Sequence, residues 1–148
     1  MRSTNPRRFL SEAETAAVQA AIKDAERGTS AELKVVLARH CWGSLKTKAR
    51  RIFSELGLRQ TQERNCVLLL LVVANREFLL YGDEGLHEKV GQDFWDDVCR
   101  QMLDAFRGER FAEGICQGIR LIGEKLAGYF PHRRADTDEI SNEIVYRR

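Results

Sequence analysis

The sequence lacks the features that mark membrane-spanning and secreted proteins. Its longest uncharged apolar run, from Cys66 to Ala74, has nine residues, fewer than half of the roughly 20 that a transmembrane helix needs. The first ten residues contain three arginines but no apolar segment like that of a signal peptide. We therefore expect a cytoplasmic protein without a transmembrane segment.

Several spacings that define metal and catalytic sites are also missing. The four cysteines form no C-x-x-C pair and have no histidine at zinc-finger spacing, so we expect buried thiols in a reducing compartment. There is no G-x-x-x-x-G-K-S/T phosphate loop, no G-x-G-x-x-G turn and no G-x-S-x-G nucleophile elbow. These absences argue against nucleotide hydrolysis, dinucleotide chemistry and α/β-hydrolase chemistry, and we expect no organic cofactor.

The composition is that of one soluble globular domain. The chain has 148 residues, of which 43% are hydrophobic and 31% charged, and its formal net charge is +2. The basic residues are scattered, and the densest group, Lys46 to Arg51, has no interleaved aromatic residues of the kind that stack on bases. We therefore expect no nucleic-acid partner, and we expect a monomer.

Hydrophobic periodicity predicts alternating helices and strands. A capping box at Ser11–Glu14 begins the first helix, and Gly28, which we expect in the left-handed conformation, ends it. The apolar runs AELKVVLAR and CVLLLLVV are typical of strands that are covered on both faces. The predicted order is helix 11–28, strand 31–39, helix 45–57, strand 66–73, strand 78–81, helix 90–106 and helix 111–129.

This order predicts a small sheet with helices on both faces. The first two strands should be parallel, because a helix connects them, and the hairpin makes the third strand antiparallel to the second. The start of the first strand at Glu32, the start of the second at Arg64 and Asn65, and the end of the third at Gly82 and Asp83 should then converge on one edge.

The residue types at this edge suit a hard divalent cation. Glu32, Asp83 and Glu84 offer carboxylate oxygens, which Ca²⁺ and Mg²⁺ prefer. Arg64 and Asn65 add a forked cation and an amide oxygen. Gly82 and Gly85 flank the acidic pair and would allow positive φ angles, which bring backbone groups close to a ligand.

Two alternatives remain open at this point. In a purely structural interpretation, Asp83 and Glu84 cap the next helix, Arg64 neutralises Glu32, and the glycines only permit the turn. In addition, ligands of open α/β sheets usually bind at the carboxyl ends of parallel strands, which here means the segment from Arg39 to Trp42.

Five stretches of the sequence, taken in order, resemble the TPM domain family. They are TSAE (Thr29 to Glu32), RNCVL (Arg64 to Leu68), GDEGL (Gly82 to Leu86) with Phe94 and Trp95 after it, FAEGICQGIRLIG (Phe111 to Gly123) and the tail DTDEISNEI (Asp136 to Ile144). Cys66 departs from the glycine usual in the family, and Ser141 departs from a proline. The chain looks like a short bacterial cytoplasmic-type member, with a TPM-like domain over residues 1–130 and a polar tail over residues 131–148.

The resemblance implies an α/β fold, a three-layer α/β/α sandwich with a small mixed sheet of three to four strands. It also implies that Glu32 and Asp83 are metal ligands for Ca²⁺ or Mg²⁺, and we expect the neighbouring Glu84 carboxylate to be a third ligand. Arg64, Asn65, Gly82 and Gly85 would be ligand-binding residues. A metal-dependent phosphatase activity is known in one branch of the family, so weak activity is one expectation, although no catalytic residue can be named.

The resemblance also allows a function of another class. Some members act as accessory proteins that assist the assembly or maintenance of membrane proteins, so a non-enzymatic interaction module is the alternative hypothesis. In that case an unidentified protein partner would dock on the acidic edge, the surroundings of Trp95 and the tail. An exposed Trp95 would favour this hypothesis, because aromatic anchors dominate binding energy at interfaces.

Overall fold

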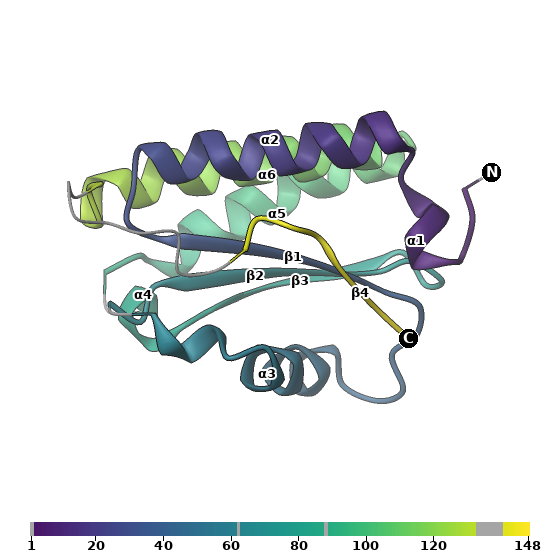
Figure 1. Ribbon diagram of the computed structural model, residues 1–148, viewed down its shortest axis with the longest axis horizontal. Coiled ribbons are helices and arrows are strands. Elements are labelled where there is room, and N and C mark those ends of the chain that lie inside the picture. Colours follow the sequence, from purple (N-terminus) through teal and green to yellow (C-terminus); the bar gives the residue numbers. More distant parts are fainter. Residues whose placement is uncertain (1, 62, 88, 133–140) are drawn as a thin grey trace.

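Helices cover both faces of a central sheet in the computed structural model, which describes residues 2–61, 63–87, 89–132 and 141–148 (Figure 1). The helices are α1 (Pro6–Phe9), α2 (Glu12–Arg27), α3 (Leu45–Glu55), η1 (Leu58–Gln60), α4 (Glu84–His87), α5 (Gln92–Arg107) and α6 (Phe111–Tyr129). Three long helices, α2, α5 and α6, lie on one face, and α3 with the short η1 lies on the other (Figure 1). The predicted α/β class and three-layer sandwich are thereby confirmed.

The sheet is mixed and has the strand order β3-β2-β1-β4. As predicted, β1 is parallel to β2, and β3 is antiparallel to β2. The fourth strand, which periodicity did not predict, comes from the end of the chain and pairs parallel with the other side of β1. The strands are β1 (Glu32–Ala38), β2 (Cys66–Val72), β3 (Glu77–Gly82) and β4 (Val145–Arg147).

Every residue of β1 and β2 is buried. Because side chains alternate along a strand, each strand supplies two cores. Leu33, Val35 and Leu37 of β1 face α2, α5 and α6, whereas Val36 and Ala38 face α3. This two-sided burial explains why both runs read as continuously apolar.

The glycines near helices have two different structural roles. Gly28 does end α2, but its φ of −98° places it in the right-handed region, so the predicted left-handed conformation is wrong. The α2 helix ends instead with the Gly28 N–H bonded to the Ala25 carbonyl at 3.2 Å. In α6, a Cβ on Gly114 would lie 2.7 Å from Cε1 of Phe106 in α5, so the glycine allows the Phe106 side chain to approach closely.

The N-terminal segment is fixed to the helical layer by Arg2. Its guanidinium makes two hydrogen bonds of 2.7 Å to Glu14 and one of 2.8 Å to the Phe9 carbonyl. Glu14 also completes the capping box with Ser11, as predicted from the sequence. These contacts hold α1 beside the ends of β1 and β4. Among the residues that the structure describes, no helix has the length and apolar character needed to cross a bilayer.

The Arg2–Glu14 pair makes a pH-dependent contribution to stability. The hydrogen bonds from Arg2 lower the pKa of Glu14 from 4.5 to about 2. Because the pKa is lower in the folded state, the stabilisation is complete above pH 4.5 and is lost as the pH falls towards 2. We expect Glu14→Gln, which retains the capping group, to lower the free energy of unfolding near neutral pH by about 1 kcal/mol.

Urea unfolding followed by circular dichroism would measure this difference. The two proteins should become equally stable as the pH approaches the folded-state pKa. A difference that stayed constant over the whole pH range would show that the charge of Glu14 is not what stabilises the N-terminal segment.

Candidate functional site

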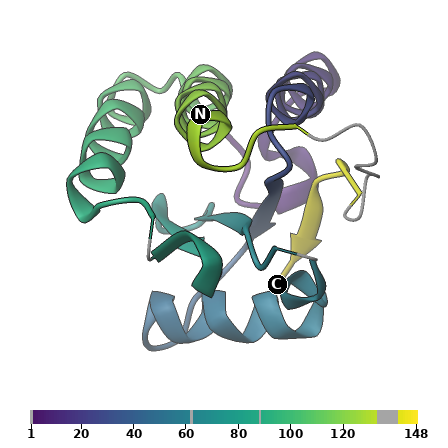
Figure 2. The ribbon, with the colours of Figure 1, turned by 90° about the vertical axis from the view of Figure 1, so that its left-hand side faces the viewer.

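The predicted edge is formed by the register of three strands. Glu32 pairs with Cys66, and Val67 pairs with Gly82, so the starts of β1 and β2 and the end of β3 lie side by side. This edge lies on the side of the molecule that faces the viewer in Figure 2, with α4 beside it. The structure thus places the residues singled out in the sequence along one edge of the sheet.

A bidentate ion pair between Arg64 and Asp83 lies at the centre of this edge. The Arg64 guanidinium donates from Nε and Nη2 to the two Asp83 oxygens at 3.0 and 3.1 Å. The Asp83 side chain is 3% exposed, and it also accepts from the Glu84 N–H at 2.7 Å. The hydrogen bonds that Arg64 donates to Asp83 raise the pKa of Arg64 above its ordinary value, so the guanidinium stays charged.

Arg64 therefore neutralises Asp83, whereas the structural interpretation of the sequence had paired it with Glu32. The guanidinium also approaches Glu84, whose Oε2 lies 3.8 Å from Nη2 and whose side chain is 80% exposed. One cation thus bridges a buried carboxylate and an exposed one. Arg64 adopts a φ of 53°, and its carbonyl accepts from the Gly85 N–H at 2.8 Å, which fixes the corner.

Asn65 lies at the same edge but belongs to a different hydrogen-bonded group. Its side-chain amide donates to Ser30 Oγ and to Glu63 Oε2, both at 3.3 Å, and Ser30 Oγ donates to the same Glu63 oxygen at 3.0 Å. Asn65 is 1% exposed. It therefore joins the start of β2 to the segment that precedes β1. No sequence pattern indicated these roles of Ser30 and Glu63.

Gly82 and Gly85 serve close packing instead of backbone flexibility. Neither has a positive φ, so that expectation was wrong. A Cβ on Gly85 would lie 2.6 Å from the Arg64 carbonyl oxygen, and one on Gly82 would lie 3.0 Å from Cδ1 of Leu86. The glycines let α4 pack directly on the segment before β2, and this contact places Asp83 beside Arg64.

Glu32 is separated from Asp83 by a whole strand. Both carboxylates flank Cys66, which pairs with Glu32 and whose carbonyl accepts from the Asp83 N–H at 3.0 Å. Residues two strands apart lie about 10 Å from each other along the sheet, so Glu32 does not join the Asp83–Glu84 pair. Burial, with the nearby charges of Glu32 and Asp83, raises the pKa of the Cys66 thiol, so it is no nucleophile.

No group of three or more His, Cys, Asp or Glu side chains arranged to hold a metal ion occurs in the described part of the chain. Asp83 and Glu84 are the two carboxylates that the Arg64 guanidinium approaches at this edge.

The two tryptophans differ in a way that sequence patterns do not reveal. Trp95 is half-buried and packs against the main core beside Phe94. Trp42, which lies beyond the carboxyl end of β1 at the opposite edge, is 88% exposed. The second edge considered from the sequence, Arg39 to Trp42, thus carries the exposed aromatic side chain.

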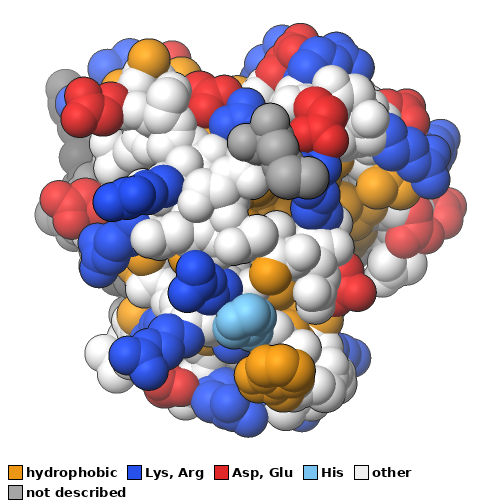
Figure 3. Space-filling model, turned by 90° about the vertical axis from the view of Figure 1, so that its right-hand side faces the viewer, with side chains coloured by type: hydrophobic (Ala, Val, Ile, Leu, Met, Phe, Trp, Pro, Cys, Tyr) orange, Lys and Arg blue, Asp and Glu red, His pale blue; other side chains and the backbone are white. Residues whose placement is uncertain are grey.

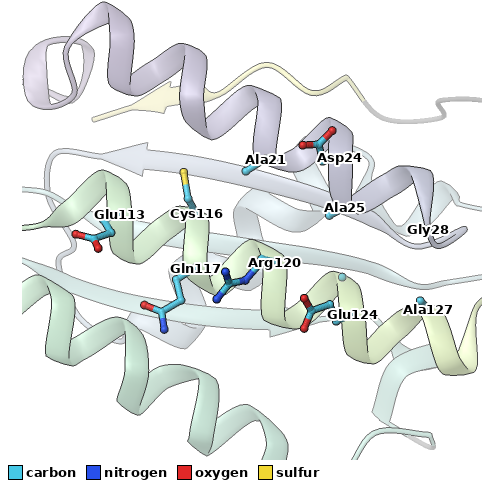
Figure 4. Close-up of a pocket in the computed structure, with 11 residues that line it drawn as sticks. Ala21, Asp24, Ala25, Gly28, Glu113, Cys116, Gln117, Arg120, Glu124 and Ala127 are labelled. Carbon is cyan, nitrogen blue, oxygen red and sulfur yellow. The ribbon is translucent and has the colours of Figure 1, made fainter.

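A hollow of about 780 Å³ lies between α2 and α6 (Figure 4). Its wall combines small residues with acidic and basic side chains, and it includes none of the residues predicted for the site. Burial raises the pKa of the Cys116 thiol in this wall, so it is a poor nucleophile. The hollow offers no defined ligand chemistry.

Comparison with known proteins identifies relatives of the whole domain. The TPM domain family model matches residues 3–125. The NMR structure of the BA42 protein from the psychrophilic bacterium Bizionia argentinensis is 33% identical. It covers 97% of this chain and 99% of its own, with a TM-score of 0.91. No curated protein matches.

Two more distant structures share the fold. The N-terminal domain of a P. gingivalis protein has a TM-score of 0.67 at 21% identity, covering 84% of this chain and 82% of that one. The N-terminal domain of cg2496 from Corynebacterium glutamicum has a TM-score of 0.63 at 14% identity, covering 92% and 80%. In the tail that resembled the family, residues 136–140 lie outside the described residues. The match over residues 3–125 nevertheless spans β1 to β3, α2, α3 and α5 and most of α6, and the chain belongs to the TPM domain family.

Proposed function

We propose that this TPM domain binds a hard divalent cation, Ca²⁺ or Mg²⁺, at the Asp83 edge by exchange with the Arg64 guanidinium. One observation carries the proposal: a cationic group already bridges the Asp83 and Glu84 carboxylates. A position that stabilises a guanidinium between two carboxylates also favours a metal ion of higher charge. Arg64 is 39% exposed, so it can swing into solvent when it is displaced.

The residues at the edge would have different roles in binding the cation. Asp83 and Glu84 would supply the carboxylate ligands, with Glu32 as a more distant negative charge on β1. Asn65, Gly82 and Gly85 would position the corner through the contacts that they already make. With two carboxylates and a competing guanidinium, we expect affinity at the weak end of calcium sites, about millimolar.

Arg64→Ala and Asp83→Asn should change the metal affinity in opposite directions. Removing Arg64 removes the competing cation, so we expect Ca²⁺ to bind several-fold more tightly. Asp83→Asn should abolish saturable binding, and Glu84→Gln, a change at an exposed position, should weaken binding about tenfold. Backbone amide NMR shifts of the chelator-treated protein, followed during titration with Ca²⁺ and Mg²⁺, would measure these affinities.

The matched control is Asp24→Asn, which removes an exposed carboxylate from α2 and should change nothing at the edge. Weaker binding by Arg64→Ala would overturn the exchange mechanism. Flat spectra at millimolar metal, in the wild type and in Arg64→Ala alike, would overturn the cation site.

Hydrolysis of phosphate esters is a weaker inference from this geometry. The name of the family model includes the word phosphatase, and a displaced Arg64 would be free to hold phosphate oxygens. Efficient metal-dependent phosphatases, however, use denser ligand sets, often with two ions. We expect p-nitrophenyl phosphate to be hydrolysed no faster by the protein with Mg²⁺ or Ca²⁺ than by the metal in buffer. Metal-dependent turnover that both Asp83→Asn and Arg64→Ala abolish would contradict this expectation.

The alternative, a non-enzymatic module that docks a protein partner through Trp95, has less support. Trp95 packs against the core, so its ring offers little free surface for a partner. A membrane-associated partner was part of that hypothesis, and no contact of the described residues identifies one.

A further inference from the structure

The opposite edge of the sheet, at the carboxyl ends of β1 and β2, is strongly basic. Between Glu32 and Glu55 the sequence runs for 22 residues without an acidic side chain, and this stretch contains six lysines and arginines. The stretch leads from β1 into α3, and the basic ends of α1 and β4 lie beside it. Figure 3 shows this face, where Lys and Arg side chains gather on the lower left half.

Backbone and side-chain contacts join the basic segments into one surface. The Arg39 N–H donates to the Arg147 carbonyl at 3.0 Å, and Lys48 Nζ donates to the Arg148 carbonyl at 3.0 Å. The Arg7 guanidinium lies 5.1 Å from the centre of the Tyr146 ring. We call Arg7, Arg39, Trp42, Lys46, Lys48, Arg147 and Arg148 the basic face.

A small hollow opens within the basic face. Its volume is about 270 Å³, and four arginines, Arg7, Arg39, Arg147 and Arg148, line it together with Asn5, Pro6 and Tyr146. Arg147 is paired with Glu55 at 3.1 Å, and Arg39 donates to the Thr4 carbonyl at 3.2 Å. No acidic side chain lines the hollow, so its size and charge suit a phosphate group.

Trp42 projects from the basic face on a tight loop. The next residue, Gly43, has a φ of 94°, a conformation that L side chains rarely adopt, and the Cys41 thiol donates to the Gly43 carbonyl at 3.7 Å. The His40 ring stacks against one side of Trp42, with ring centroids 5.4 Å apart. The indole is thus held away from the core, with 88% of its surface exposed to solvent.

We propose that the basic face docks on anionic phospholipid bilayers, with Trp42 inserted at the level of the headgroups. Tryptophan favours the membrane interface because its ring is apolar and its N–H is polar. Lysines and arginines around such an anchor are attracted to anionic headgroups. The arginine-lined hollow then receives one lipid phosphate. In this arrangement the domain lies on the membrane surface without crossing it.

The surroundings of Trp42 favour a bilayer over a protein or a nucleic acid. The core of a protein interface is depleted of charged residues, whereas the sequence on either side of Trp42 carries Arg39, Lys46 and Lys48 and no acidic residue. Among the described residues, the other large apolar side chains that are exposed are Leu103 and Tyr129. They belong to α5 and α6 and not to the basic face. Single-stranded nucleic acids require successive open aromatic rings, but His40 covers one side of Trp42 and Arg7 lies over Tyr146.

Vesicle co-sedimentation of the full chain would test the proposal. We expect binding to phosphatidylcholine vesicles in which about one lipid in three is phosphatidylglycerol, and much weaker binding to pure phosphatidylcholine. Trp42→Ala should weaken binding by about tenfold or more, and Lys46→Gln by about fivefold. Raising NaCl from about 0.1 M to about 0.5 M should release the protein.

Matched control variants test whether binding depends on the basic face itself or on any exposed cation or aromatic side chain. Tyr129→Ala removes an exposed aromatic side chain from α6, and Lys23→Gln removes an exposed cation from α2, so both should bind like the wild type. Trp42 and Lys46 are exposed, so their variants should keep the thermal stability of the wild type, which circular dichroism would check.

Several outcomes of the binding experiments would overturn the proposal. They are equal binding to both kinds of vesicle, no binding to either, unchanged binding by Trp42→Ala, and tighter binding to a single-stranded oligonucleotide than to anionic vesicles. Release of the bound protein by millimolar glycerol phosphate would also overturn it, because the hollow would then be a site for small soluble phosphates.

Discussion

Burial of β1 and β2 on both faces is the constraint on which the rest of the structure depends. All seven residues of each strand are inside the protein. A sheet with such strands at its centre needs a helical layer on each side. The lengths of these strands also decide where polar chemistry can occur, because charged side chains that serve a ligand must leave the sheet at its ends. The two candidate surfaces are therefore at opposite ends of the same pair of strands.

The two ends manage their charge differently. At the acidic end, the buried Asp83 is neutralised internally by Arg64, so the electrostatic free energy is already used to hold the corner together. At the basic end, most of the cations are at the surface and have few acidic neighbours, with Glu55 beside Arg147 as one of them. A ligand at the acidic end must therefore displace Arg64. An anion at the basic end, in contrast, is attracted by cations that have few acidic partners within the protein.

Sequence patterns predicted the elements whose causes are local. The capping box at Ser11, the buried strands and the convergence of Glu32, Arg64 and Asp83 follow from short-range periodicity and strand direction. The ion pair between Arg64 and Asp83 could not be predicted in this way. It depends on α4 packing against the segment before β2, and this packing requires the absence of a side chain at Gly85. The β4 strand was missed because its three residues are only half-buried, and their pairing depends on contacts from distant parts of the chain.

The Lys34 side chain has a consequence for the solubility of the domain. Its ammonium, on a residue only 6% exposed, donates to the carbonyls of Ser141 and Glu143, and β4 begins two residues later. A buried charge is thus used to hold the last strand against β1. Without β4, the buried and largely apolar strand β1 would become the open edge of the sheet, where strands of other molecules can pair. The short strand β4 therefore protects β1 from pairing with other molecules, and the hydrogen bonds of Lys34 hold β4 in place.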